Sequence, residues 1–424
     1  MRVTIKQGRI IDPANKLDKV ADLHIQNGRI IAIGKTPSGF KPDRLIEAKN
    51  HLVCPGLVDL AARLREPGEE YKATIASETT AAASTGITTI CCPPDTSPVI
   101  DTSAVVELIH QRTLLNKKTK VYCLGALTQG LKGETLASMH AMKSAGCIGI
   151  SNAYEPVKDT AVLRRALEYA ATCGLTVHLY CEDNYLHENG AVHEGIMSAR
   201  LGLPGLPDTA ETIAVSRALL LIEQTGARVH FCRISSARSI NLLSQAKAQG
   251  LPVTADVGIT NLYLTEIDLD GFNSLCHLRP PLRTTTDRDE LRKAVASGII
   301  DAVCSDHQPH DEDAKSAPFS LTEPGASTID VLLPLVLQLV SDKVIDLHTA
   351  IAALTIKPAS IAGINAGSLA VDAPADICII NPDTAWTVEK STLQSAGKNN
   401  PFIGWEMTGK VTHTLLDGEI IYNN

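Results

Sequence analysis

The sequence predicts an α/β protein, a (β/α)8 TIM-type barrel with a small β domain built from both ends of the chain. Three observations predict it: the length of 424 residues exceeds one small core, the two ends are rich in strand patterns, and the middle alternates short apolar runs with segments of helical period. That alternation is typical of parallel strands joined by helices, although a doubly wound open sheet is the alternative it allows. The eight predicted strands lie at about 53–60, 86–92, 120–127, 146–151, 175–181, 227–233, 252–258 and 300–306.

The ends of the chain have a different pattern from the middle. Alternating apolar and polar residues around glycine turns occur at 3–11, 22–33, 375–380 and 411–422, as in paired antiparallel strands. Asp417-Gly418 is a typical hairpin turn. We therefore expect residues 1–54 and 366–424 to form one composite β-sandwich domain, and residues 55–365 to form the barrel.

Charge and composition exclude several classes of protein. A formal net charge of -8 argues against binding to nucleic acid or to an anionic membrane surface. The first residues lack the pattern of a signal peptide, and no apolar run is long enough to span a bilayer. The eleven cysteines are scattered without a CxxC pair, which favours buried free thiols over a zinc ribbon. We expect a cytoplasmic protein without membrane contact.

The segments after the predicted strands are the candidate site, because barrel enzymes place their active sites at the carboxyl ends of the strands. They carry a specific set of motifs at 55–59, 64–68, 94–101, 280–283, 305–310, 323–325 and 398–404. On these motifs, nearly the whole chain resembles the class I dihydroorotases of the amidohydrolase superfamily. The resemblance implies zinc bound by two histidines after strand 1, a carboxylate after strand 4, histidines after strands 5 and 6, and an aspartate after strand 8.

The metal positions that the resemblance assigns do not match a zinc enzyme. They are Ala61, Arg63, Asn152, Ala153, Tyr180, Arg233 and Asp306. A methyl group cannot bind zinc and a guanidinium repels it, while the single remaining carboxylate, Asp306, does not hold zinc against water. We therefore expect no catalytic residue beyond a vestigial Asp306, no metal and no cofactor.

The two arginines suggest what replaces the metal. Arg63 and Arg233 would place two fixed charges near Asp306, and a bidentate ion pair could take the metal's place. The alternative is that both arginines reach solvent. His178 lies two residues before Tyr180 and should face the same way, one layer deeper, whereas His230 should point elsewhere. We interpret both histidines as buried barrel residues, and a shifted metal site of His178 with Asp306 is the alternative.

Substrate positions are altered as well. The resemblance assigns the substrate carboxylate to an arginine, an asparagine and a histidine, which correspond to Arg65, Asp95 and His310. Asp95 would repel a carboxylate. Arg65, Asp306, His307 and His310 therefore either pack the barrel mouth or retain some ligand binding.

Three functions follow as hypotheses. The resemblance is to inactive dihydroorotases that accompany the catalytic chain of bacterial aspartate transcarbamoylase, and it implies a non-catalytic subunit of that assembly in pyrimidine biosynthesis. It also implies a homodimer or a larger hetero-oligomer. The alternative is an active dihydroorotase or related cyclic amidohydrolase with an atypical site. The third is a protein that senses a small anion at Arg63, Arg65 and Arg233.

Overall fold

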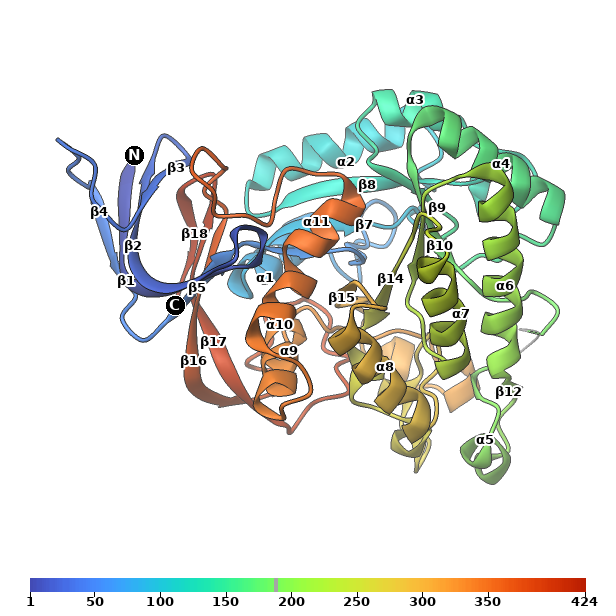
Figure 1. Cartoon of the computed structure of the whole chain (residues 1–424). Helices are drawn as coiled ribbons and strands as arrows, with labels where there is room; N and C mark the ends of the chain where they lie inside the picture. The colour runs from blue at the N-terminus through green and yellow to red at the C-terminus, as the bar shows by residue number, and fades with distance from the viewer. Residues whose placement is uncertain (187–189) are drawn as a thin grey trace.

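The computed structural model describes residues 1–186 and 190–424, and two eight-stranded sheets organise it (Figure 1). One sheet is parallel, and its strands are joined in the order β15-β14-β13-β10-β9-β8-β7-β6. These strands are β6 (Leu57–Asp59), β7 (Ile87–Cys92), β8 (Lys120–Ala126), β9 (Gly149–Ser151), β10 (Thr176–Tyr180), β13 (Val229–Cys232), β14 (Val253–Gly258) and β15 (Ala302–Cys304).

The two end strands of this order, β6 and β15, meet just beyond their carboxyl ends. Ala62 and His307 form a parallel bridge, in which His307 N–H donates to Ala61 O at 3.2 Å and Arg63 N–H donates to His307 O at 2.9 Å. The sheet thus curls into a nearly closed barrel. This confirms the predicted barrel, and the open doubly wound sheet was wrong.

Helices connect the barrel strands and surround the barrel (Figure 1). They are α1 (Ile75–Ser84), α2 (Ser103–Asn116), α3 (Met139–Ser144), α4 (Thr160–Cys173), α6 (Asp208–Thr225), α7 (Ala237–Ala248), α8 (Thr285–Ser297), α9 (Leu332–Ser341), α10 (Leu347–Leu354) and α11 (Ile356–Ala362). An excursion before α6 carries the short pair β11 (Val192–His193) and β12 (Gly205–Leu206) with helix α5 (Ile196–Leu201). Buried apolar side chains fill the space between strands and helices, so the helices fix the positions of the strand ends.

The second sheet combines strands from both ends of the chain. Its order is β18-β17-β16-β5-β1-β2-β3, and β4 pairs with β1. Its strands are β1 (Arg2–Asp12), β2 (Leu17–Gln26), β3 (Arg29–Ile33), β4 (Arg44–Glu47), β5 (Leu52–Pro55), β16 (Ile377–Thr387), β17 (Glu406–Leu416) and β18 (Glu419–Asn423). Val3, Ile10, Leu23, Ile377 and Leu415 belong to its own buried core, and α9 packs against β17.

The first predicted barrel strand is divided between the two sheets. Residues 53–60 were expected to form one strand, but β5 pairs with β16 in the terminal sheet and β6 pairs with β7 in the barrel. Gly56 lies at the break, where its N–H donates to Asp376 O at 2.8 Å. A Cβ at Gly56 would lie 2.2 Å from Thr88 Oγ1, so only glycine lets the chain pass this close to β7.

Several local predictions also agree with the structure. Asp417 and Gly418 have φ of 46° and 76° and join β17 to β18 as the expected hairpin. All eleven cysteines are free thiols, and all except Cys173 are buried. Among the described residues, no helix combines the length and apolarity needed to cross a bilayer.

Candidate functional site at the barrel mouth

The centre of the barrel mouth, the face at the carboxyl ends of the strands, is the contact between Tyr154 and Asp306. The tyrosine hydroxyl lies 2.8 Å from Asp306 Oδ1 and 2.7 Å from Oδ2, and Gln308 Nε2 donates to the tyrosine hydroxyl at 3.1 Å. Burial and the neighbouring charge of Asp306 raise the pKa of Tyr154 well above its ordinary value. The hydroxyl therefore stays protonated and donates a hydrogen bond to the carboxylate.

Two buried arginines flank this carboxylate. Arg63 Nη1 lies 3.5 Å and Arg233 Nε lies 3.7 Å from Asp306 Oδ1, and each arginine is only 4% exposed. The Arg63 guanidinium also stacks over the Tyr154 ring, 4.3 Å from its centre. Neither arginine reaches solvent. Each pairs with Asp306 through Oδ1 alone, so the bidentate pair that was considered does not form. The shortest bonds to Asp306 come from Tyr154.

Arg63 also forms an ion pair with Asp95. Arg63 Nε donates to Asp95 Oδ2 at 2.7 Å. Burial alone would raise the pKa of Asp95, but the charge and hydrogen bond of Arg63 hold it below its ordinary value. The aspartate at this position thus acts as the counter-ion of an arginine, and its negative charge is satisfied within the protein.

Aromatic and charged side chains close the other side of the mouth. The rings of Tyr154 and Tyr180 meet edge to face with their centres 4.7 Å apart. Tyr180 donates to Glu182 Oε2 at 2.8 Å, and Arg279 donates to Glu182 Oε1 at 2.8 Å. Asn152 Nδ2 binds the backbone oxygen of Tyr180 at 2.9 Å. Tyr180 and Asn152 therefore have partners within the protein.

The backbone at the strand ends turns sharply toward the mouth. Arg65, Ala153, Arg233 and Asp306 have left-handed φ of 62°, 48°, 52° and 49°, a conformation that costs non-glycine residues about 1–2 kcal/mol each. Since Ala153 turns the chain, the next side chain, Tyr154, projects over the mouth. Sequence reasoning assigned no role to Tyr154, Arg279 or Glu182, although Tyr154 and Glu182 lie close to assigned metal positions and Arg279 precedes the motif at 280–283.

The residues expected to hold a substrate carboxylate are bound to other groups of the protein. Arg65 Nη2 lies 3.1 Å from His310 Nε2, and Arg65 also binds Pro309 O and Glu69 at 2.9 Å. Burial and the charge of Arg65 lower the pKa of His310 to about 2. The hollow beside Arg63, Arg65 and Asp95 measures 10 Å³, which is about the space of one water molecule.

Comparison with known proteins identifies the family of this barrel. Residues 50–239 match the family model described as Dihydro-orotase-like, and residues 339–422 match that of the Amidohydrolase family. A dihydroorotase-like protein of Pseudomonas putida is 49% identical over 100% of this chain and 99% of its own. A dihydroorotase of Geotalea daltonii is 38% identical over 100% of this chain and 99% of its own. The chain belongs to the dihydroorotase-like family of amidohydrolases.

Solved structures confirm the fold of this dihydroorotase-like chain. The L-hydantoinase of Arthrobacter aurescens superposes with a TM-score of 0.90 and 23% identity, over 99% of this chain and 96% of that one. The dihydropyrimidinase of Brevibacillus agri superposes with a TM-score of 0.86 and 22% identity. At this identity, the likeness concerns the amidohydrolase fold alone.

The residues present do not fit the zinc that the family pattern implies. Ala61 offers no donor atom, Arg63 and Arg233 bring positive charge to the same space, and both oxygens of Asp306 already accept from Tyr154. Zinc sites in proteins need three or four nitrogen, sulfur or carboxylate ligands. Among the residues that the structure describes, the mouth of this dihydroorotase-like barrel therefore supplies no set of ligands for a dication.

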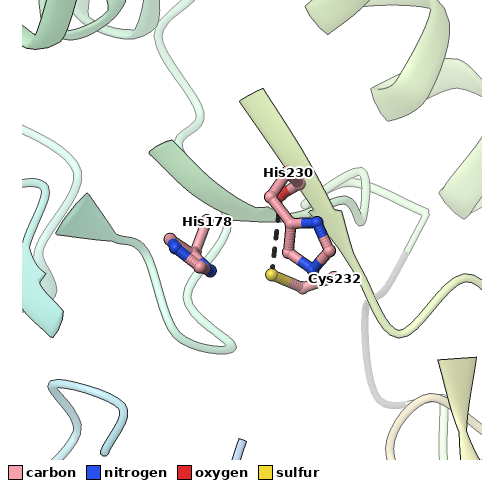
Figure 2. Close-up of side chains that lie close together, drawn as sticks. All are labelled: His178, His230 and Cys232. Atoms are coloured by element: carbon pink, nitrogen blue, oxygen red, sulfur yellow. Dashed lines mark hydrogen bonds between the residues drawn. The ribbon is translucent and has the colours of Figure 1, made fainter. Parts of the chain in front are cut away.

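His178, the histidine considered for a shifted metal site with Asp306, lies near His230 and Cys232 inside the barrel (Figure 2). His178 faces inward one layer below Tyr180, and its nearest candidate co-ligands are His230 and Cys232, without Asp306. The expectation that His230 points elsewhere was wrong, because its ring centre lies 5.2 Å from that of His178. Strand alternation was counted back from Arg233, whose left-handed backbone breaks the alternation.

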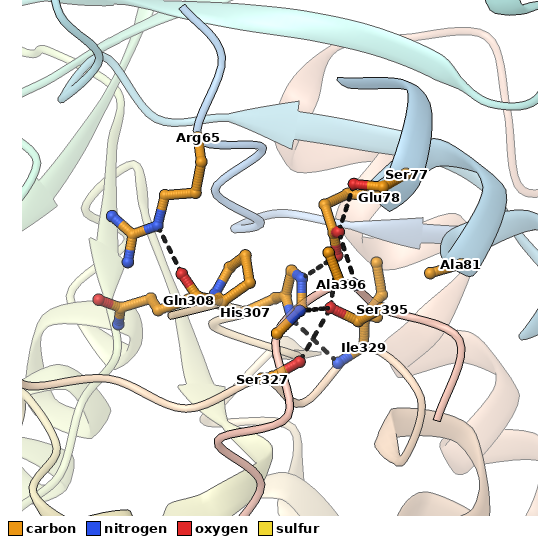
Figure 3. A network of polar contacts seen from close by, with 12 residues as sticks. Arg65, Ser77, Glu78, Ala81, His307, Gln308, Ser327, Ile329, Ser395 and Ala396 are labelled. Atoms are coloured by element: carbon orange, nitrogen blue, oxygen red, sulfur yellow. Dashed lines mark hydrogen bonds and ion pairs between the residues drawn. The ribbon is translucent and has the colours of Figure 1, made fainter. Parts of the chain in front are cut away.

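Behind the mouth, a buried carboxylate joins three distant segments (Figure 3). Glu78 on α1 accepts from His307 Nε2 at 2.7 Å, from Ser395 Oγ at 2.6 Å and from Ala396 N–H at 3.1 Å. Burial alone would raise the pKa of Glu78, but His307 and the hydroxyls of Ser395 and Ser77 hold it below its ordinary value. This network fixes His307, the residue that follows Asp306.

We expect Tyr154→Phe to lower the free energy of unfolding by about 1–3 kcal/mol at pH 7, because Asp306 loses its shortest donor. Urea unfolding checks this. Tyr169→Phe is the matched control, since the hydroxyl of Tyr169 accepts a single 3.3 Å bond from His140 N–H near the surface, and it should cost less than about 1 kcal/mol. Equal effects of the two substitutions would contradict the central role of the Tyr154–Asp306 contact.

We expect Glu78→Gln to destabilise the fold by about 1–3 kcal/mol at pH 7, because His307, Ser395 and Ala396 lose a charged acceptor for their hydrogen bonds. The folded pKa of Glu78 is lowered, so its stabilisation is present above the unfolded pKa and is lost as the pH falls through the folded pKa. Urea unfolding from pH 7 to pH 4 should show the gap between wild type and variant narrowing. Glu107→Gln, at an exposed position on α2, should show no gap; a constant gap for Glu78→Gln would contradict the assignment.

Proposed function

We propose that this chain is a catalytically inactive dihydroorotase-like subunit that assembles with and supports aspartate transcarbamoylase in pyrimidine biosynthesis. The observation that carries the loss of activity is the state of Asp306, whose two oxygens accept from Tyr154 and lie beside Arg63 and Arg233. Hydrolysis of a cyclic amide without a Lewis acid forfeits several kcal/mol of stabilisation of the developing oxyanion. Nothing else at the mouth replaces that contribution among the described residues.

The substrate positions support the same proposal. Arg65 is bound to His310, Pro309 and Glu69, and Asp95 is bound to Arg63. A substrate carboxylate would have to displace these partners and approach the negative charge of Asp95. A small anion sensor at Arg63, Arg65 and Arg233 meets the same obstacle, because each of these charges already has a carboxylate or carbonyl partner.

The partnership rests on the resemblance and on the relatives' names. The proteins of Pseudomonas putida and Pseudomonas aeruginosa named dihydroorotase-like are 49% and 47% identical over the full chain. A barrel that keeps its helices, core and strand ends without a metal site is suited to present a surface to another protein. We propose that the other protein is the catalytic chain of aspartate transcarbamoylase, in a homodimeric or larger hetero-oligomeric complex.

An active cyclic amidohydrolase is the second candidate, and a specific observation favours it. Full-length relatives 37–39% identical to this chain are named dihydroorotase. This alternative requires turnover at a mouth whose only expected ligand is Asp306. Metal content and turnover separate the two candidates.

We expect the purified chain to hold no zinc at the mouth and to give no turnover of dihydroorotate or carbamoyl aspartate above background, because five of the six expected ligand positions lack a suitable donor. Elemental analysis and an absorbance assay check this. Asp306→Ala is the matched control, since turnover that survives this substitution comes from a contaminant. Turnover that is zinc-dependent and abolished by Asp306→Ala would sink the proposal. Ala61→His alone should restore nothing, as one ligand does not make a site.

We expect the chain to co-elute with the catalytic chain of aspartate transcarbamoylase on size-exclusion chromatography with light scattering at micromolar concentration. The complex should have a defined mass, and transcarbamoylase activity should survive dilution or heating better in the complex than alone. A catalytically active (β/α)8 barrel of similar size is the negative control. Independent elution of the two proteins would remove the partnership.

A further inference from the structure

A second group of ligand-type side chains lies inside the barrel, below the mouth. His178 on β10 and His230 and Cys232 on β13 form the His–Cys cluster (Figure 2). One ligand atom from each residue lies within 4.8 Å of the others, and all three residues are buried. This cluster uses neither Asp306 nor any residue assigned to the family's metal positions.

One atom of the His–Cys cluster has no partner. His178 is 1% exposed, and its Nε2 makes no hydrogen bond, although buried polar atoms in proteins are nearly always bonded. Gly149 leaves the room for this ring, because a Cβ there would lie 3.0 Å from His178 Nε2. His178 thus adds an imidazole with an unbonded nitrogen to a group that already holds a second imidazole and a thiol, and this set of donors suits a soft metal ion.

The surroundings of His230 resemble the outer shell of a metal site. His230 Nε2 lies 2.9 Å from Asp256 Oδ2, and its Nδ1 lies 2.9 Å from Thr254 Oγ1. A ligating histidine commonly donates its other N–H to a carboxylate, which fixes its orientation and strengthens it as a ligand. If Asp256 holds Nε2–H, Nδ1 becomes a ligand when the Thr254 hydroxyl turns away.

A hollow at the opposite end of the barrel reaches one neighbour of the His–Cys cluster. A hollow of 590 Å³ opens at the amino ends of β10, β13 and β14, and its lining includes Thr176, Val229 and Thr254. Thr254 is the residue bonded to His230. The hollow thus reaches a residue in contact with His230, and its lining also includes Lys143 and Arg228.

We propose that the His–Cys cluster binds a monovalent thiophilic cation, copper(I). Two imidazoles with one thiolate suit copper or zinc, and the local charge selects between them. Arg233 Nη1 lies 3.7 Å from Asp256 Oδ2, so the interior beside the cluster already carries an arginine. Copper(I) and the Cys232 thiolate sum to zero charge, whereas a dication would add an unbalanced charge to a buried site.

Binding is a ligand exchange without oxidation or reduction. The Cys232 Sγ–H bond breaks, its proton leaves to water, and a sulfur–copper bond forms. The thiol also releases its 3.6 Å contact to His230 O. The inference does not depend on the proposed function, because none of the three ligands is a family metal position, although Cys232 packs against Tyr154 and Tyr180 of the mouth.

The test is anaerobic titration of the full chain with copper(I) in competition with bicinchoninate. We expect one tightly held equivalent per chain, and X-ray absorption should report one sulfur and two nitrogen ligands. His178→Leu and Cys232→Ser should each weaken binding at least 10-fold. Cys123→Ser, which removes a buried thiol outside the cluster, is the matched control and should leave binding unchanged.

Loss of copper(I) to the competitor, or unchanged binding in both cluster variants, would overturn the proposal. If a cluster variant fails to fold, the X-ray absorption spectrum of the wild-type protein decides alone. A spectrum with sulfur ligands and no nitrogen ligands would place the ion at other cysteines and overturn the proposal. Zinc(II) is titrated in parallel. Retention of zinc at the same residues in preference to copper(I) would overturn the assignment to a monovalent ion.

Discussion

The barrel mouth depends on one constraint, a largely buried carboxylate at the carboxyl end of β15. Asp306 is 12% exposed at its side chain, and a carboxylate removed from water must be paired or hydrogen-bonded. In this chain the protein supplies the whole compensation: a tyrosine hydroxyl at hydrogen-bond distance, two arginines slightly farther away, and Asp95 to balance the surplus positive charge. Each of these side chains has at least one charged or hydrogen-bonded partner within the protein, while Arg63 Nη2, Asp95 Oδ1 and Arg233 Nε make no hydrogen bond.

The backbone at the same strand ends also shapes the mouth. Left-handed conformations persist at Arg65, Ala153, Arg233 and Asp306, where they aim residues at the centre of the mouth. Such conformations persist only where the surrounding structure holds them. The Glu78–His307–Ser395 network behind β15 is one such support. The turns at the strand ends thus direct side chains toward the mouth, and polar contacts within the protein hold those side chains there.

Much of the fold could be predicted from the sequence, because the apolar runs and the dihydroorotase-like motifs are local signals. The division of residues 53–60 between two sheets was not predictable from apolar character, since the break at Gly56 depends on its approach to Thr88. The arrangement of the site was harder still. Tyr154 bonds Asp306, which lies 152 positions later in the sequence. His230 faces inward, and the count back from Arg233 missed this because Arg233 leaves the strand pattern. Both facts depend on backbone turns that residue types do not reveal.

The terminal sheet has a consequence for how the chain is made. β5 lies between β1 and β16, so its outer hydrogen bonds are completed only when the last part of the chain has left the ribosome. Until then, β5 offers an open edge that other chains can join, while the barrel segments emerge and begin to fold. A nascent chain of this protein therefore exposes this open edge of β5 for most of its synthesis. Protection by chaperones matters most before residue 377 has been made.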